Sequence, residues 1–160
     1  MFLQLLHLAQ AALAGYGAQQ SYVAITNLLK YEDASKKAAK ISNEAGHQLH
    51  KTRTTHTSGA AALTVSLLVS LLLAVRGSSY GFLVRYLASP VMLAAVFFAR
   101  AHVQEYWAGR DGKTVGVKVP LPKMEGYNEA QAKTEELLKV LGWLVMSWAA
   151  TSVVALFGGY

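Results

Sequence analysis

The sequence has no cysteine, only three prolines, and few charged residues, which make up 15% of the chain. Without cysteine the chain can form no disulfide, no thiolate nucleophile and no Cys-based zinc or iron–sulfur site. Hydrophobic residues make up 53%, and such high hydrophobicity with so little charge lies outside the ordinary usage of soluble domains. These scarcities exclude thiol chemistry and indicate a membrane protein.

Charge is also nearly absent from four long stretches, and the positive charges lie between them. Residues 30–53 hold six of the fifteen Lys and Arg residues, and residues 100–139 hold seven more. They are Lys30, Lys36, Lys37, Lys40, Lys51 and Arg53, then Arg100, Arg110, Lys113, Lys118, Lys123, Lys133 and Lys139. Basic loops of membrane proteins stay on the cytoplasmic side, which produces this sorting. Because Glu and Asp are interleaved with the basic residues, the charge suits anionic lipid headgroups better than nucleic acid, and we predict no nucleic-acid partner.

We predict four membrane-spanning helices in a single domain of residues 1–160. A helix of roughly 20 apolar residues crosses a bilayer core of about 30 Å. The stretches that meet this requirement best lie at about 5–29, 58–75, 81–101 and 138–157.

The first stretch is the least apolar of the four, because it carries several amide side chains and His7. A helix that faces lipid would not tolerate them, whereas a helix packed inside a bundle can satisfy them through its neighbours. We therefore expect His7 to be buried and hydrogen-bonded. A cleaved signal peptide is the alternative, but the stretch lacks the basic region that begins such peptides.

The predicted fold is an all-α integral membrane four-helix bundle with two polar connections. Residues 31–57 contain no proline and are predicted to form an interfacial helix before the second span, or an extension of the first span. Residues 110–127 are predicted to form a polar loop before the fourth span. Asn128 is then expected to cap a helix that a Glu135–Lys139 ion pair stabilises.

The distribution of basic residues also predicts sidedness. Residues 30–57 and 102–137 are expected in the cytoplasm, with both termini on the opposite side of the membrane. Membrane lipid is therefore a predicted partner. Amide groups in the first span also suit packing against a further copy of the chain or another membrane subunit.

Histidines gather near the predicted cytoplasmic surface. His50 and His56 precede the second span, and His102 follows the third with Glu105 on the same helical face. These residues can be polar groups that satisfy helix ends, a general base acting near neutral pH, or a two-histidine, one-carboxylate metal site. No second H-x-x-H or E-x-x-H box supports a metal centre. We predict no metal and name His50, His56, His102 and Glu105 as candidate catalytic residues.

Two arginines and two aromatic residues near the same surface are candidate substrate-binding residues. Arg53 and Arg100 each lie where a span meets the cytoplasm, as interfacial anchors or as partners of an anionic or phenolate substrate. Tyr106 lies beside Glu105, and Trp143 lies in the first part of the last span. A tryptophan there belongs to the interfacial belt or packs against neighbours more often than it contacts a ligand.

The layout of the whole chain resembles a family of small four-helix membrane proteins that includes the fungal anthrone oxygenases. The chain differs from that family at three places. Thr26 stands where the family usually has a proline, and residues 101–107 stand in place of a P-T-N-like turn. Residues 144–147 lie where the family has an Asn and an Arg. The segments that carry the resemblance are S-Y-V-A-I-T-N-L-L (21–29), N-E-A-G-H (43–47) and E-E-L-L-K-V-L-G-W (135–143).

The resemblance implies a membrane-embedded oxygenase of the endoplasmic reticulum that acts on a lipophilic aromatic substrate of the polyketide anthrone type. It implies dioxygen as co-substrate and no redox cofactor. His50 or His56, or else His102, would remove a proton from an acidic C–H group. Arg53 or Arg100 would then hold the carbanion or phenolate.

Two other function classes compete with the oxygenase. Membrane proteins of glutathione and eicosanoid metabolism are also four-helix proteins, and Arg100, His102, Tyr106 and Gly109 are similar to the end of their third helix. That resemblance implies a glutathione-dependent transferase or isomerase. The other class is a non-enzymatic membrane subunit or scaffold whose polar first span packs against a partner.

Overall fold

The computed structural model describes residues 2–40, 43–108 and 125–158, which form four α-helices and a short 3-10 helix, with no strand in these ranges. The helices are α1 (Phe2–Ala39), α2 (Asn43–Arg76), α3 (Phe82–Ala108) and α4 (Glu125–Gly158). The 3-10 helix η1 (Gly77–Ser79) joins α2 to α3. The predicted all-α class is confirmed for the described residues.

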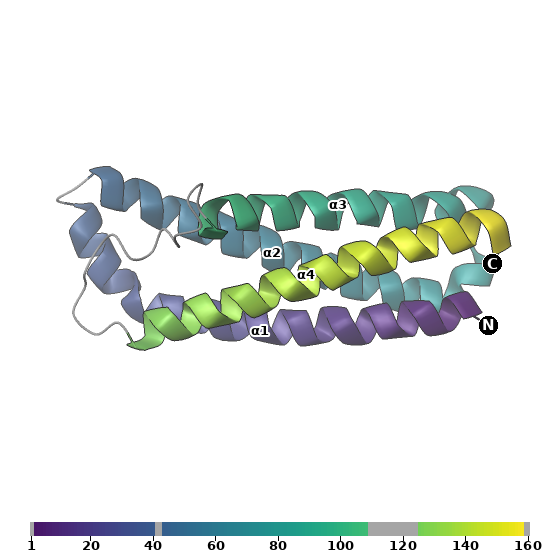
Figure 1. Ribbon diagram of the computed structural model, residues 1–160, viewed down its shortest axis with the longest axis horizontal. Coiled ribbons are helices and arrows are strands. Elements are labelled where there is room, and N and C mark those ends of the chain that lie inside the picture. Colours follow the sequence, from purple (N-terminus) through teal and green to yellow (C-terminus); the bar gives the residue numbers. More distant parts are fainter. Residues whose placement is uncertain (1, 41–42, 109–124, 159–160) are drawn as a thin grey trace.

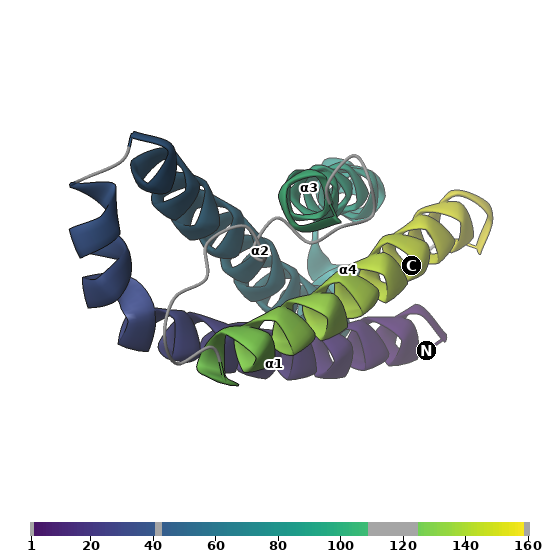
Figure 2. The ribbon, with the colours of Figure 1, turned by 60° about the vertical axis from the view of Figure 1, so that its left-hand side comes forward.

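The four helices run alternately up and down the long axis of the molecule (Figure 1). Both ends of the chain lie at one end of the bundle, and the connection between α1 and α2 lies at the other. Each helix packs against two others, in the order α1, α2, α3, α4 and back to α1. In Figure 2, α1 and α3 lie on opposite sides of α2 and α4.

Three helices are long and apolar enough to cross a membrane. Their candidate spans are Arg53–Ser79, Phe82–Trp107 and Ala132–Phe157. The predicted spans 58–75 and 138–157 lie inside them. α1 does not reach the same mean hydropathy, since its sequence mixes amides with apolar residues.

The core consists mainly of buried leucines, with the indole of Trp148 packed among them. Leu63, Leu137, Leu141 and Leu144 are all fully buried, as is the indole of Trp148. Gly17 lets α1 approach this core closely. A Cβ at that position would lie 2.7 Å from Cδ2 of Leu63 and 2.8 Å from Cγ1 of Val140.

Arg85 fastens the turn between α2 and α3. Its Nε donates a hydrogen bond to the carbonyl oxygen of Tyr80 at 2.7 Å, and its Nη2 donates to the carbonyl of Ser78. One carbonyl lies inside η1 and the other directly after it, so Arg85 stabilises the connection between α2 and α3.

The first helix ends later than its predicted span. α1 continues to Ala39, as the predicted extension of the first span, and a new helix begins at Asn43, so residues 31–57 do not form one interfacial helix. The predicted start of the last helix is wrong, because α4 begins at Glu125, three residues before the predicted cap at Asn128.

Candidate functional site

The bundle interior holds a satisfied polar network near the chain termini. Nδ1 of His7 lies 2.7 Å from Oε1 of Gln10, and Nε2 of Gln10 donates to Oγ1 of Thr151 at 3.3 Å. The indole of Trp148 packs 5.8 Å from the His7 ring and donates from Nε1 to Oγ of Ser66 at 2.9 Å. The network confirms the prediction that His7 is buried and hydrogen-bonded, and it links α1, α2 and α4.

The other end of the interior contains a buried histidine whose ring nitrogens are not satisfied. His56 is 3% exposed, and its ring meets the ring of Trp107 edge to face at 5.2 Å. Within the described part of the chain, neither Nδ1 nor Nε2 of His56 has a hydrogen-bond partner. The indole of Trp107 donates instead to Oγ1 of Thr55, at 3.3 Å.

Two further buried polar atoms for which the described helices supply no partner lie near the level of this histidine along the bundle axis. Oε1 of Gln20 and Oγ of Ser21 are buried on α1 without a partner among the described residues. Gly17 lies level with Leu63, and α1 and α2 run in opposite directions. Ser21 and His56 therefore lie within about one helical turn, about 5 Å, along the bundle axis. We call His56, Trp107, Thr55, Gln20 and Ser21 the His56 cluster.

Leaving such groups unpaired is costly. Each buried donor or acceptor without a partner costs about 1–3 kcal/mol, and buried polar groups in native proteins are nearly always paired with protein or water. The unpaired atoms of the His56 cluster therefore need a partner that donates and accepts hydrogen bonds, such as water or a bound polar group. The surroundings are apolar, because Gly59 packs between Val103 and Leu137 one turn from His56.

Arg100 lies two turns from Trp107 along the same face of α3. Its Nε is buried and has no hydrogen-bond partner, and no acidic side chain of the described residues pairs with it. The guanidinium faces α4 at Gly142, where a Cβ would lie 3.4 Å from Nε. The structure therefore directs Arg100 toward the contact between α3 and α4.

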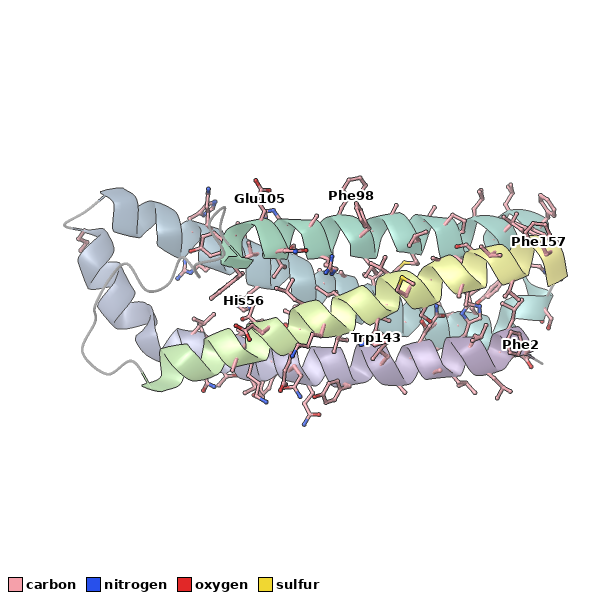
Figure 3. The ribbon with its side chains drawn as sticks, in the orientation of Figure 1. Phe2, His56, Phe98, Glu105, Trp143 and Phe157 are labelled. Atoms are coloured by element: carbon pink, nitrogen blue, oxygen red, sulfur yellow. The ribbon has the colours of Figure 1, made fainter. Side chains whose placement is uncertain are left out.

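Other candidate residues lie on the outside of the helices. His50, Arg53, His102, Glu105 and Trp143 are exposed. Figure 3 shows Glu105 projecting from the outer side of α3, far from His56. Thus the structure does not bring His102 and Glu105 together with the buried histidine.

Tyr106 belongs with the buried group. It is half-buried, and its ring packs edge to face on Trp107 at 5.6 Å. Among the described residues, no three His, Asp or Glu side chains lie close enough to hold a metal ion. The side chain of His47 and all of Gly109 lie outside the described residues.

Trp107, Gln20 and Ser21 were not predicted to belong to the candidate site. For Trp107 a weak signal exists, because Val96, Val103 and Trp107 recur at helical spacing on one face of α3, and all three are buried. For Gln20 and Ser21 the only signal is that they lie in an uncharged stretch. Comparisons with protein-family models, with curated proteins and with solved structures find no match to this chain.

Proposed function

We propose that this protein is an integral membrane enzyme with four spans, and that it acts on a lipophilic aromatic substrate bound at the His56 cluster. The observation that carries the proposal is the buried His56 ring with both nitrogens unpaired. It lies between apolar walls in a bundle whose helices suit a membrane.

α1 serves as the fourth span because its polar side chains face the bundle and its apolar side chains face outward, the opposite of a helix on the surface of a soluble protein. Its polar residues His7, Gln10, Gln20, Ser21 and Asn27 are all buried against the bundle. Between Phe2 and Leu29, the only exposed side chain that is neither aliphatic nor aromatic is that of Gln19. A helix with apolar residues outside and polar residues inside suits a lipid environment, and the amide of Gln10 is paired with His7 and Thr151. The low mean hydropathy of α1 therefore does not argue against a span.

The proposed chemistry is the one that the anthrone-oxygenase resemblance implies. His56 accepts a proton from an acidic ring CH2 group of the substrate. The resulting anion reacts with dioxygen, and the CH2 group becomes a carbonyl while the second oxygen atom leaves as water. Apolar walls exclude bulk water, and Trp107 and Tyr106 offer aromatic faces to the substrate ring. In this proposal the membrane is that of the endoplasmic reticulum, with the connection between α1 and α2 in the cytoplasm.

The test compares three histidines in nanodiscs with an anthrone as substrate. His56→Gln is expected to lower kcat for oxygen uptake at least about 100-fold, because general-base catalysis contributes 10²–10⁴. His50→Gln and His102→Gln are matched controls on exposed residues, and each should retain the wild-type rate. An unchanged rate in His56→Gln, or no oxygen uptake by the wild-type protein, would overturn the assignment.

The alternative that the protein is a non-enzymatic subunit is less well supported, because most amides of α1 do not face outward. Gln20 and Asn27 are turned toward the chain's own bundle, so they are not available to a partner helix. Only Gln19 presents an amide outward.

A further inference from the structure

Two cations without an acidic partner flank the contact between α3 and α4. Arg100 has an unpaired Nε. Lys139 is exposed and forms no ion pair with a described residue, although Glu135 precedes it by one turn. The predicted Glu135–Lys139 pair is therefore wrong. α4 instead pairs Lys133 with Glu136 at 3.4 Å, and this leaves Lys139 as a free positive charge.

Gly142 brings the two cations to one surface. It follows Lys139 by three residues, so both lie on the same face of α4. A Cβ at Gly142 would lie 3.4 Å from Nε of Arg100 and 4.0 Å from its Nη2. The guanidinium of Arg100 therefore lies against the backbone of α4 at this glycine. Trp143, which is 68% exposed, follows directly.

Along the bundle axis, this surface lies where the exposed side chains change from apolar to polar, as they do at the boundary of a bilayer. Toward the chain termini the exposed side chains are apolar, including Phe97, Phe98 and Met146. In the other direction along α3, His102 and Glu105 are exposed. A tryptophan and cations at such a boundary lie at the level of lipid headgroups.

We propose that Arg100, Lys139, Gly142 and Trp143 form a binding site for the phosphate of an anionic phospholipid. A guanidinium can donate two parallel hydrogen bonds to phosphate oxygens, and an ammonium adds a second charge. Basic pockets between helices at the cytoplasmic surface bind such headgroups. A zwitterionic lipid fits less well, because Lys139 repels its choline group.

Trp143 supplies the measurement. Trp107 and Trp148 are 4% and 0% exposed, so brominated acyl chains of surrounding lipid quench mainly Trp143. The protein is placed in vesicles of brominated phosphatidylcholine with increasing unbrominated phosphatidylglycerol. Relief of quenching gives the preference for the anionic lipid, expected on the order of 25-fold for two cations. Each cation contributes about fivefold, so Arg100→Gln and Lys139→Gln should each reduce the preference by about that factor.

The controls separate this site from general surface charge and from free phosphate. Lys133→Gln removes a charge from the same helix, but one already paired with Glu136, and the preference should stay at the wild-type value. Inorganic phosphate at 10 mM, roughly the upper physiological range, should not abolish it, since the acyl chains hold the lipid in place. Three results would each overturn the proposal. The first is that Lys133→Gln loses as much of the lipid preference as Arg100→Gln, and the second is that Arg100→Gln keeps its helical content and its full preference. The third is that inorganic phosphate abolishes the preference for the anionic lipid.

Discussion

Replacing Trp148 with alanine is expected to lower the free energy of unfolding by about 3–5 kcal/mol, the cost of deleting a large buried aromatic side chain. The indole is fully buried, packs on His7 and donates to Ser66. Its removal leaves a cavity where α1, α2 and α4 meet and breaks a hydrogen bond between α4 and α2. No other described side chain of this size is as completely buried.

Trp143 gives the matched control, because it is the same residue five positions earlier on the same helix. Its side chain is 68% exposed, so Trp143→Ala should change the free energy of unfolding by no more than about 0.5 kcal/mol. Loss of helical circular dichroism during titration of detergent-purified protein with sodium dodecyl sulfate measures both variants. Equal destabilisation by the two changes would mean that Trp148 does not close the core.

Replacing Gly17 with valine is expected to cost about 3 kcal/mol, because the position is already filled by its neighbours. Even a single Cβ there would lie 2.7 Å from Leu63 and 2.8 Å from Val140. Leu63 and Val140 are both buried, so their side chains cannot shift without disturbing the core where α1 packs against α2 and α4.

Gly15, two residues earlier on α1, is the control for helix propensity. A Cβ at Gly15 would meet nothing within 4 Å, so Gly15→Val should be neutral or slightly stabilising, since valine favours a helix more than glycine does. The same titration, together with the rate of proteolysis of α1, distinguishes the variants. If Gly15→Val and Gly17→Val unfold alike, the close contact of α1 with α2 and α4 is wrong.

The helices could be predicted from the sequence because their signals are local. Uncharged runs identify α2, α3 and α4, and the amides of the first stretch already indicate a helix that packs inside a bundle. The burial of His7 followed from the same reasoning. The end of α1 at Ala39 was harder to predict, because the Lys and Ala residues that precede it are compatible with a longer helix.

The candidate site could be predicted only in part, because spacing shows which residues share a face but not which face meets the bundle. His50 and His56 both precede the second predicted span, yet the first is exposed and the second is 3% exposed. His102 and Glu105 share a face as predicted, and it is the outer one. Unpaired atoms such as the ring nitrogens of His56 depend on all four helices, so no local pattern predicts them.

Cysteine accessibility tests the central claim, four membrane crossings with α1 among them, most directly. The chain has no cysteine of its own, so Phe2→Cys, Lys40→Cys and Gly158→Cys each create a single target. In sealed vesicles a membrane-impermeant maleimide reaches only the outer side. It should label Lys40→Cys alone, or, if the protein is inserted the other way round, Phe2→Cys and Gly158→Cys but not Lys40→Cys. Detergent should expose all three. Labelling of Phe2→Cys and Lys40→Cys from the same side would contradict the account, because α1 would then not cross the bilayer.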